Sequence, residues 1–160
     1  MEIERKFLLE KFPEQLPLLE SSEVEQGYLS VTPAVRIRSK TINGKTSYRL
    51  CIKGKGTLVR EEVELPLEKD AFQRLKNLLP GEMIRKEFRV YKLYGGYELE
   101  CNLVDHGSET EFMYAEVEFD SVEDANAFIP PDFLGEDITE RPGSSMSAYW
   151  QRTRLNNSNT

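Results

Sequence analysis

The 160-residue chain is poor in several features that often carry chemistry or anchor a protein. It has only two cysteines and one histidine, and no apolar run approaches the roughly 20 residues of a membrane-spanning helix. Two cysteines without zinc-site spacing exclude a disulfide scaffold and suit a reducing compartment. The first residues also lack the apolar segment of a secretory signal. We therefore expect a cytoplasmic protein that does not enter a membrane.

The charge and size of the chain indicate which partners it binds and how many domains it has. The net charge is -7 and 31% of the residues are charged. A chain that is acidic overall repels the phosphate backbone, so we predict no nucleic-acid partner. The hydrophobic content of 39% suffices for a packed core, and the length suits one ordinary domain. We expect this single domain over residues 1–155, followed by a frayed tail over residues 156–160.

Most of the chain alternates between polar and apolar residues with a period of two, which is typical of strands. The predicted strands cover residues 2–9, 25–30, 34–40, 46–52, 59–67, 84–91, 97–103 and 113–119. Helical periodicity predicts three helices, over residues 68–79, from Ser121 to before Pro130, and over about residues 144–154. Strands and helices do not alternate regularly, which favours an α+β fold with a mainly antiparallel sheet. A closed barrel and a sandwich both fit this pattern.

The charged residues follow the alternation. Two glutamates flank one apolar residue in five places, namely Glu2/Glu4, Glu23/Glu25, Glu62/Glu64, Glu98/Glu100 and Glu116/Glu118. Arg36 and Arg38 flank Ile37 in the same way. Because residues i and i+2 of a strand point to the same face, each triplet places two like charges side by side.

These charged faces have two interpretations. They are either the solvent faces of amphipathic strands or the lining of a barrel whose apolar faces point outward. Solvent faces usually mix charges of both signs with neutral polar residues, and like charges that lie close together repel each other. We favour an eight-stranded, closed, tunnel-like barrel with a charged interior and a few flanking helices. Carboxylates bind hard cations such as Mg²⁺ or Mn²⁺, and arginines bind phosphate, so a metal–polyphosphate complex is the expected ligand.

The order of these motifs resembles the CYTH superfamily of triphosphate tunnel metalloenzymes. Met1 to Phe7 resembles the family's N-terminal E-x-E-x-K motif, and residues 35–38 resemble its paired-arginine strand. Residues 49–54 and 59–64 resemble the lysine and R-x-E-x-E strands, and residues 97–100 and 115–119 resemble the acidic strands. The resemblance implies an eight-stranded antiparallel tunnel that holds a triphosphate with divalent metal. The chain is most similar to stand-alone bacterial inorganic tripolyphosphatases.

The resemblance and the charges together assign roles. Phosphate oxygens are expected to bind basic residues, namely Lys6, Arg36, Arg38, Lys53, Arg60, Lys86, Arg89 and Arg141. Two metal ions, Mg²⁺ or Mn²⁺, are expected on carboxylates, namely Glu2, Glu4, Glu62, Glu64, Glu116 and Glu118. Lys6, Glu4 and Glu116 are the expected catalytic residues.

Two segments depart from the family pattern. The sixth strand usually carries K-x-R, but here Lys86 is followed by Phe88 in the arginine place. A one-residue bulge would bring Arg89 inward instead. Near the C-terminus, Arg141 is the single basic candidate in a segment where the family often shows a basic-aromatic-x-Asn sequence.

The expected function is hydrolysis of the terminal phosphoryl group of a triphosphate, with inorganic tripolyphosphate as the leading substrate. Thiamine triphosphate hydrolysis, cyclisation of ATP by an adenylate cyclase, and binding of polyphosphate or nucleotide without turnover are the alternatives. The expected partner is thus a small-molecule triphosphate, bound by a monomer or a homodimer.

Overall fold

The computed structural model describes residues 1–155, so the predicted frayed tail lies outside the described residues. The strands are β1 (Glu2–Leu8), β2 (Leu18–Val31), β3 (Ala34–Ile42), β4 (Lys45–Lys53), β5 (Val59–Arg60), β6 (Glu62–Leu67), β7 (Ile84–Lys92), β8 (Glu98–Val104) and β9 (Phe112–Glu118). The helices are α1 (Lys69–Lys76), α2 (Val122–Ala127) and α3 (Met146–Trp150), the last continued by a π-helical turn over Gln151–Leu155.

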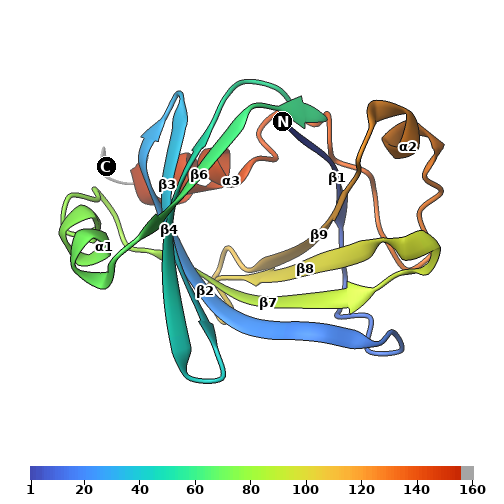
Figure 1. Ribbon diagram of the computed structural model, residues 1–160, viewed down its shortest axis with the longest axis horizontal. Helices are drawn as coiled ribbons and strands as arrows, with labels where there is room; N and C mark the ends of the chain where they lie inside the picture. The colour runs from blue at the N-terminus through green and yellow to red at the C-terminus, as the bar shows by residue number, and fades with distance from the viewer. Residues whose placement is uncertain (156–160) are drawn as a thin grey trace.

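The strands form a closed antiparallel barrel (Figure 1). Their order is β5-β1-β9-β8-β7-β2-β3-β4-β6. The two outermost strands, β5 and β6, are consecutive pieces of one segment that is interrupted at Glu61. Arg60 of β5 pairs with Glu2 of β1, while Glu62 of β6 pairs with Lys53 of β4. This segment therefore joins the two edges of the sheet and closes the barrel. The predicted architecture is confirmed, with nine strands in place of eight because of this interruption.

Strand β2 is much longer than its predicted range of residues 25–30. It begins at Leu18, and its first half pairs with β7, with Glu20 opposite Val90. The segment from Leu18 to Ser22 does not alternate, so the sequence carries no strand signal there. Pairing with β7 extends the strand, because tertiary context overrides a weak local preference.

Two of the hydrophobic clusters lie outside the barrel, between the sheet and the helices. Ile37 points outward from β3, is fully buried, and packs with Phe72 of α1. On another side, Phe7 of β1 and Val117 of β9 pack with residues at the end of α2, including Phe128. Figure 1 shows α1 and α2 on opposite sides of the ring of strands. The predicted arrangement of apolar faces outward and charged faces inward is therefore confirmed for these strands.

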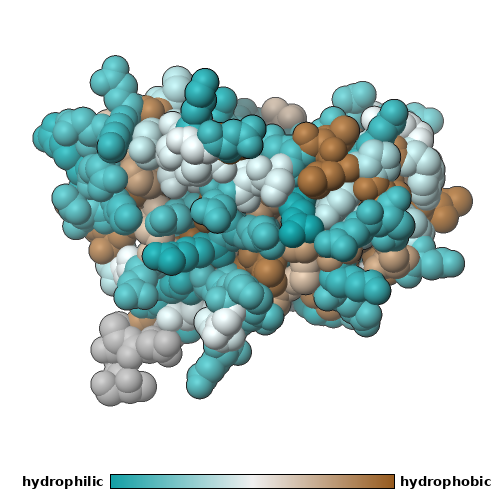
Figure 2. Space-filling view, turned by 90° about the horizontal axis from the view of Figure 1, so that it is seen from below, coloured by the Kyte–Doolittle hydropathy of each residue, from teal (hydrophilic) through white to brown (hydrophobic). Residues whose placement is uncertain are grey.

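The third helix covers another part of the barrel. Trp150 of α3 is fully buried and its ring lies 6.0 Å from that of Tyr28 on β2. None of the helices within residues 1–155 is long and apolar enough to cross a bilayer. The face of the molecule in Figure 2 is mostly hydrophilic, with apolar side chains in small separate groups.

Candidate active site

A cavity of about 630 Å³ lies inside the barrel, and its two main walls carry opposite charge. One wall is built by β6, β1, β9 and β8 and presents carboxylates, namely Glu62, Glu64, Glu2, Glu4, Glu116, Glu118, Glu98 and Glu100. The other wall is built by β3, β4 and β7 and presents cations, namely Arg36, Arg38, Lys40, Lys53 and Lys86. Lys6 and Arg60 add positive charge to the acidic wall. A cavity of this kind suits a ligand that carries both anionic groups and a cation.

Strand register brings the charges together from distant parts of the sequence. Glu4 lies opposite Glu118 in the β1–β9 pair, and Lys6 lies opposite Glu116. Glu116 also lies opposite Glu100 of β8. Directly opposed residues of antiparallel strands have Cβ atoms about 5 Å apart, so these side chains interact.

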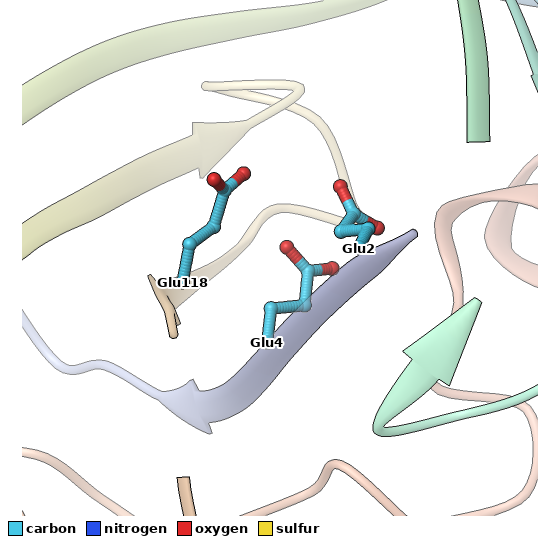
Figure 3. Close-up of side chains that lie close together, drawn as sticks. All are labelled: Glu2, Glu4 and Glu118. Carbon is cyan, nitrogen blue, oxygen red and sulfur yellow. The ribbon is translucent and has the colours of Figure 1, made fainter. Parts of the chain in front are cut away.

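Three of the carboxylates form a cluster that fits a metal ion. Glu2, Glu4 and Glu118 each offer an oxygen atom, and the three atoms lie within 4.8 Å of one another. Figure 3 shows Glu2 and Glu4 on one strand and Glu118 on another, with the carboxylates turned toward a common space. An all-oxygen donor set is the one that hard divalent cations prefer. The other three predicted metal ligands lie outside this cluster.

The electrostatics of the cluster also favour a bound cation. Burial and the charge of Glu116 raise the pKa of Glu4 well above its usual value. Burial likewise raises the pKa of Glu2 to about 7. These raised pKa values mean that the surroundings of Glu2 and Glu4 disfavour the ionised form of the carboxyl group. A divalent cation among them would offset that cost.

Two of the remaining predicted ligands, Glu62 and Glu64, have basic partners. Lys53 Nζ lies 3.0 Å from Glu2 Oε1 and 3.4 Å from Glu62 Oε2, so it bridges β1 and β6. Arg49 Nη1 lies 3.5 Å from Glu64 Oε1. These contacts leave both Glu62 and Glu64 on the cavity lining but turn them toward cations.

The carboxyl groups of Glu4 and Glu116 influence each other's pKa. Burial alone would raise the pKa of Glu116, but the charge of Lys6 and a hydrogen bond from Glu4 lower it to about 2. The same hydrogen bond contributes to the raised pKa of Glu4. The pKa values of the two carboxyl groups are therefore shifted in opposite directions.

A second group of side chains forms a cationic chamber around Tyr114. Lys86 Nζ donates a hydrogen bond to Tyr114 Oη at 2.9 Å, and Lys6 Nζ lies 4.2 Å from the centre of the Tyr114 ring. Lys6 Nζ also donates to the carbonyl oxygen of Ser144 at 2.6 Å. Burial lowers the pKa of Lys6, and burial together with the charge of Arg38 lowers the pKa of Lys86 well below its usual value. Cations held so close together in a buried space favour an anionic ligand.

One predicted phosphate ligand is misplaced. Arg89 points away from the cavity, where its guanidinium lies 4.0 Å from the centre of the Phe12 ring and Nη1 donates to Tyr91 Oη at 3.2 Å. The expected bulge is absent from the pairing of β7 with β8, which stays in register from Lys86 to Lys92. Lys86 is therefore the basic residue of β7 that faces the tunnel, and the prediction for Arg89 is wrong.

Two other predicted phosphate ligands, Arg60 and Arg141, lie on the cavity lining, and each has a partner. Arg60 Nε donates to the carbonyl oxygen of Gly54 at 3.2 Å. Arg141 lies at the edge of the cavity and is paired with Glu136. Arg141 is also half-exposed, which separates it from the buried cationic chamber.

The structure also corrects one of the acidic triplets. Glu23 is exposed and Glu25 half-buried on the outer face of β2, where Glu25 lies 3.8 Å from Lys76 of α1. For this pair the first interpretation of the charged faces holds, because the two glutamates lie on a solvent face and not on the barrel lining. Glu98 and Glu100, in contrast, both line the cavity.

Sequence reasoning missed several residues of the lining. Lys40 and Glu20 form an ion pair inside the cavity, and Tyr114 and Asn102 also line it. Alternation could have identified three of them, because Lys40 continues Arg36 and Arg38, Tyr114 precedes Glu116 by two residues, and Asn102 follows Glu100 by two. Glu20 lies in the part of β2 that has no strand signal.

Comparisons with known proteins agree with this geometry. The model of the CYTH domain matches residues 1–130. An inorganic triphosphatase from Nitrosomonas europaea is 37% identical over 139 residues, which cover 87% of this chain and 89% of the relative.

Solved structures share the fold. The crystal structure of the inorganic triphosphatase NE1496 has a TM-score of 0.65 at 30% identity and covers 93% of each chain. A putative adenylyl cyclase from Hippeastrum, described as having a dominant triphosphatase activity, has a TM-score of 0.61 and covers 79% of this chain and 83% of its own. At 18% identity, the second likeness concerns the fold alone. With a family match over most of its length and a close relative within the family, this chain belongs to the CYTH domain proteins.

Proposed function

We propose that the protein is a metal-dependent inorganic triphosphatase, which hydrolyses the terminal phosphoryl group of tripolyphosphate. The observation that carries this proposal is the two-walled cavity, in which a cluster of three carboxylates faces a set of buried cations. The relative from Nitrosomonas europaea, named an inorganic triphosphatase, supports the same substrate.

The cationic wall is the proposed binding surface for the phosphate chain. Arg36, Arg38 and Lys86 line it, and Lys53 and Lys6 extend it toward the carboxylates. Their role is to bind non-bridging oxygens and to stabilise charge that develops on the leaving phosphate in the transition state. Phosphoryl transfer depends mainly on such positioning and electrostatic stabilisation, so the reaction needs no covalent protein nucleophile.

Glu2, Glu4 and Glu118 are the proposed ligands of Mg²⁺ or Mn²⁺, with Glu62, Glu64 or Glu116 available to a second ion. A divalent ion supplies charge neutralisation and lowers the pKa of a bound water. Among the protein groups, Glu116 lies opposite Lys6, whose charge lowers the pKa of Glu116, so it is the carboxylate held in its ionised form beside the substrate. Lys6 holds that carboxylate in position and offers positive charge to the phosphate.

The test is a phosphate-release panel with tripolyphosphate, ATP, thiamine triphosphate and pyrophosphate. Each substrate is supplied with Mg²⁺, with Mn²⁺ and with chelator. We expect release from tripolyphosphate to be fastest and to stop in chelator. Faster turnover of ATP or thiamine triphosphate would assign an organic substrate, and formation of cyclic AMP with pyrophosphate would identify a cyclase. Binding of tripolyphosphate without release of phosphate would refute catalysis.

The oligomeric state, the number of bound metal ions and the cellular location are further predictions. A monomer or a homodimer is expected, and light scattering of the purified protein distinguishes them. The number of metal ions per active site can be counted by calorimetric titration. A cytoplasmic location is inferred from the two buried, unpaired cysteines, Cys51 and Cys101, which suit a reducing compartment.

A further inference from the structure

Asn102 is a buried amide whose side chain lacks hydrogen-bond partners. It lies on β8, two residues beyond Glu100 and on the same face, and it lines the cavity. Its exposed fraction is 1%. Neither Nδ2 nor Oδ1 makes a hydrogen bond within residues 1–155. Most buried polar side-chain atoms in proteins are hydrogen-bonded, so this amide calls for a partner from outside the protein.

The position of Asn102 in the barrel indicates what that partner is. It lies opposite Tyr114 in the β8–β9 pair and opposite Phe88 in the β7–β8 pair. Tyr114 is the residue around which Lys6 and Lys86 gather. Asn102 is thus a neutral donor in the wall of the cationic chamber.

The carboxylate cluster is separated from Asn102 along the strands. On β9 the inward residues follow one another as Tyr114, Glu116 and Glu118, and Asn102 lies level with Tyr114. The four residue-to-residue steps from Tyr114 to Glu118 span about 13 Å of extended strand. A phosphate chain whose metal-bound part lies at Glu118 and that runs along the strands would therefore point its other end toward Asn102.

A second unpartnered group faces the same cavity. Arg36 Nε is buried without a hydrogen-bond partner among the described residues, although Arg36 also lines the cavity. An anion with several acceptor oxygens can satisfy both Arg36 Nε and Asn102 Nδ2. A neutral amide is well suited to this place, because a further cation would repel Lys6, Lys86 and Arg36.

We propose that Asn102 is a substrate-binding residue that holds the phosphate at the end of the chain farthest from the carboxylate cluster. Nδ2 donates to the phosphoryl oxygens, and Oδ1 accepts the hydrogen of a protonated phosphate hydroxyl. The inference rests on the proposed function in that it takes a triphosphate as the ligand. It adds a substrate-binding residue that neither its charge nor the resemblance to the family identifies.

The test measures tripolyphosphate binding to the full chain by calorimetry in chelator, where hydrolysis does not interfere. Asn102→Leu keeps the size of the side chain and removes its hydrogen bonds. We expect its Kd to rise on the order of 10- to 100-fold, as for a hydrogen bond to a charged group. Asn102→Asp adds a negative charge at the same size and should weaken binding further. Asn102→Ala serves as the second neutral variant if leucine disturbs the fold, and thermal unfolding checks each protein.

Ser22→Ala is the matched control. The Ser22 hydroxyl is also buried without a partner, but Ser22 does not line the cavity. Its removal should leave the Kd for tripolyphosphate within about twofold of the wild-type value, a change small beside the loss of one charged hydrogen bond.

The outcomes separate this inference from the proposed function. A Kd of the neutral Asn102 variants close to that of wild type, or an equal loss in Ser22→Ala, would overturn the role of Asn102. If the Asn102 variants weaken binding while wild type with Mg²⁺ releases no phosphate, the role of Asn102 stands and the proposed hydrolysis fails.

Discussion

Replacing Glu100 with glutamine should stabilise the metal-free protein in a strongly pH-dependent way. Burial, together with the charges of Glu116 and Glu118, raises the pKa of Glu100 from 4.5 to about 8. Because the folded-state pKa exceeds the unfolded one, the folded protein holds this proton more tightly than the unfolded chain does. The contribution of Glu100 is therefore most favourable below pH 4.5 and is lost as the pH rises through about 8.

The size of the effect follows from that interval. The shift from 4.5 to about 8 corresponds to about 5 kcal/mol of unfolding free energy when the carboxylate is fully ionised, at ~1.36 kcal/mol per pH unit. Relaxation of the cavity makes this an upper limit. Glutamine has the same shape without the charge, so Glu100→Gln should recover on the order of 2 to 4 kcal/mol near pH 8 and almost nothing near pH 4.5.

Urea unfolding of both proteins in chelator, near pH 4.5 and near pH 8, measures the difference. Glu98→Gln is the matched control, because Glu98 lies on the same strand and the same face but is exposed. Solvent screens its charge, so its removal should change the unfolding free energy little at either pH. An equal gain for Glu100→Gln at both pH values, or no gain near pH 8, would refute the reasoning that burial and repulsion penalise this carboxylate.

Two further substitutions test the proposed roles of the walls. Glu118→Gln removes one of the three clustered carboxylates, so phosphate release from tripolyphosphate should fall on the order of 100-fold and recover in part at high Mg²⁺, as a metal titration would record. An unchanged Mg²⁺ dependence would contradict the metal assignment. Arg38→Ala should raise the KM for tripolyphosphate about 10- to 100-fold, since it removes a charged hydrogen-bond donor from the lining. Arg89→Ala, on the outer face, should leave the KM near that of wild type, and an equal rise in both variants would show that neither effect is local.

Much of the barrel and its charged lining could be predicted because strand geometry turns sequence spacing into orientation. Arg36 and Arg38 are two residues apart, so they face the same side once the segment is extended, and Ile37 faces the other. The structure places the arginines on the lining and Ile37 in the outer core. Such inferences are local and need no knowledge of the partner strands.

The predictions for Glu23, Glu25 and Arg89 were wrong for one common physical reason. Whether a charged pair faces inward depends on what covers its strand, and Glu23 and Glu25 lie outside although their spacing equals that of Glu116 and Glu118. Arg89 required a bulge to face inward, and a regular pairing with β8 keeps it outside. Neither outcome is encoded in the spacing of the residues themselves.

The sequence alone determined that charge and apolar surface alternate along the strands, since this follows from two-residue periodicity and the fixed pleat of extended chain. Only the tertiary structure decided which charges meet. Register places Glu118 beside Glu4 and Lys6 beside Glu116, although more than 100 residues separate the partners in sequence. The cluster of Glu2, Glu4 and Glu118 results from the pairing of β1 with β9. Coulomb energy and burial depend on distance in space, which the order of residues does not contain.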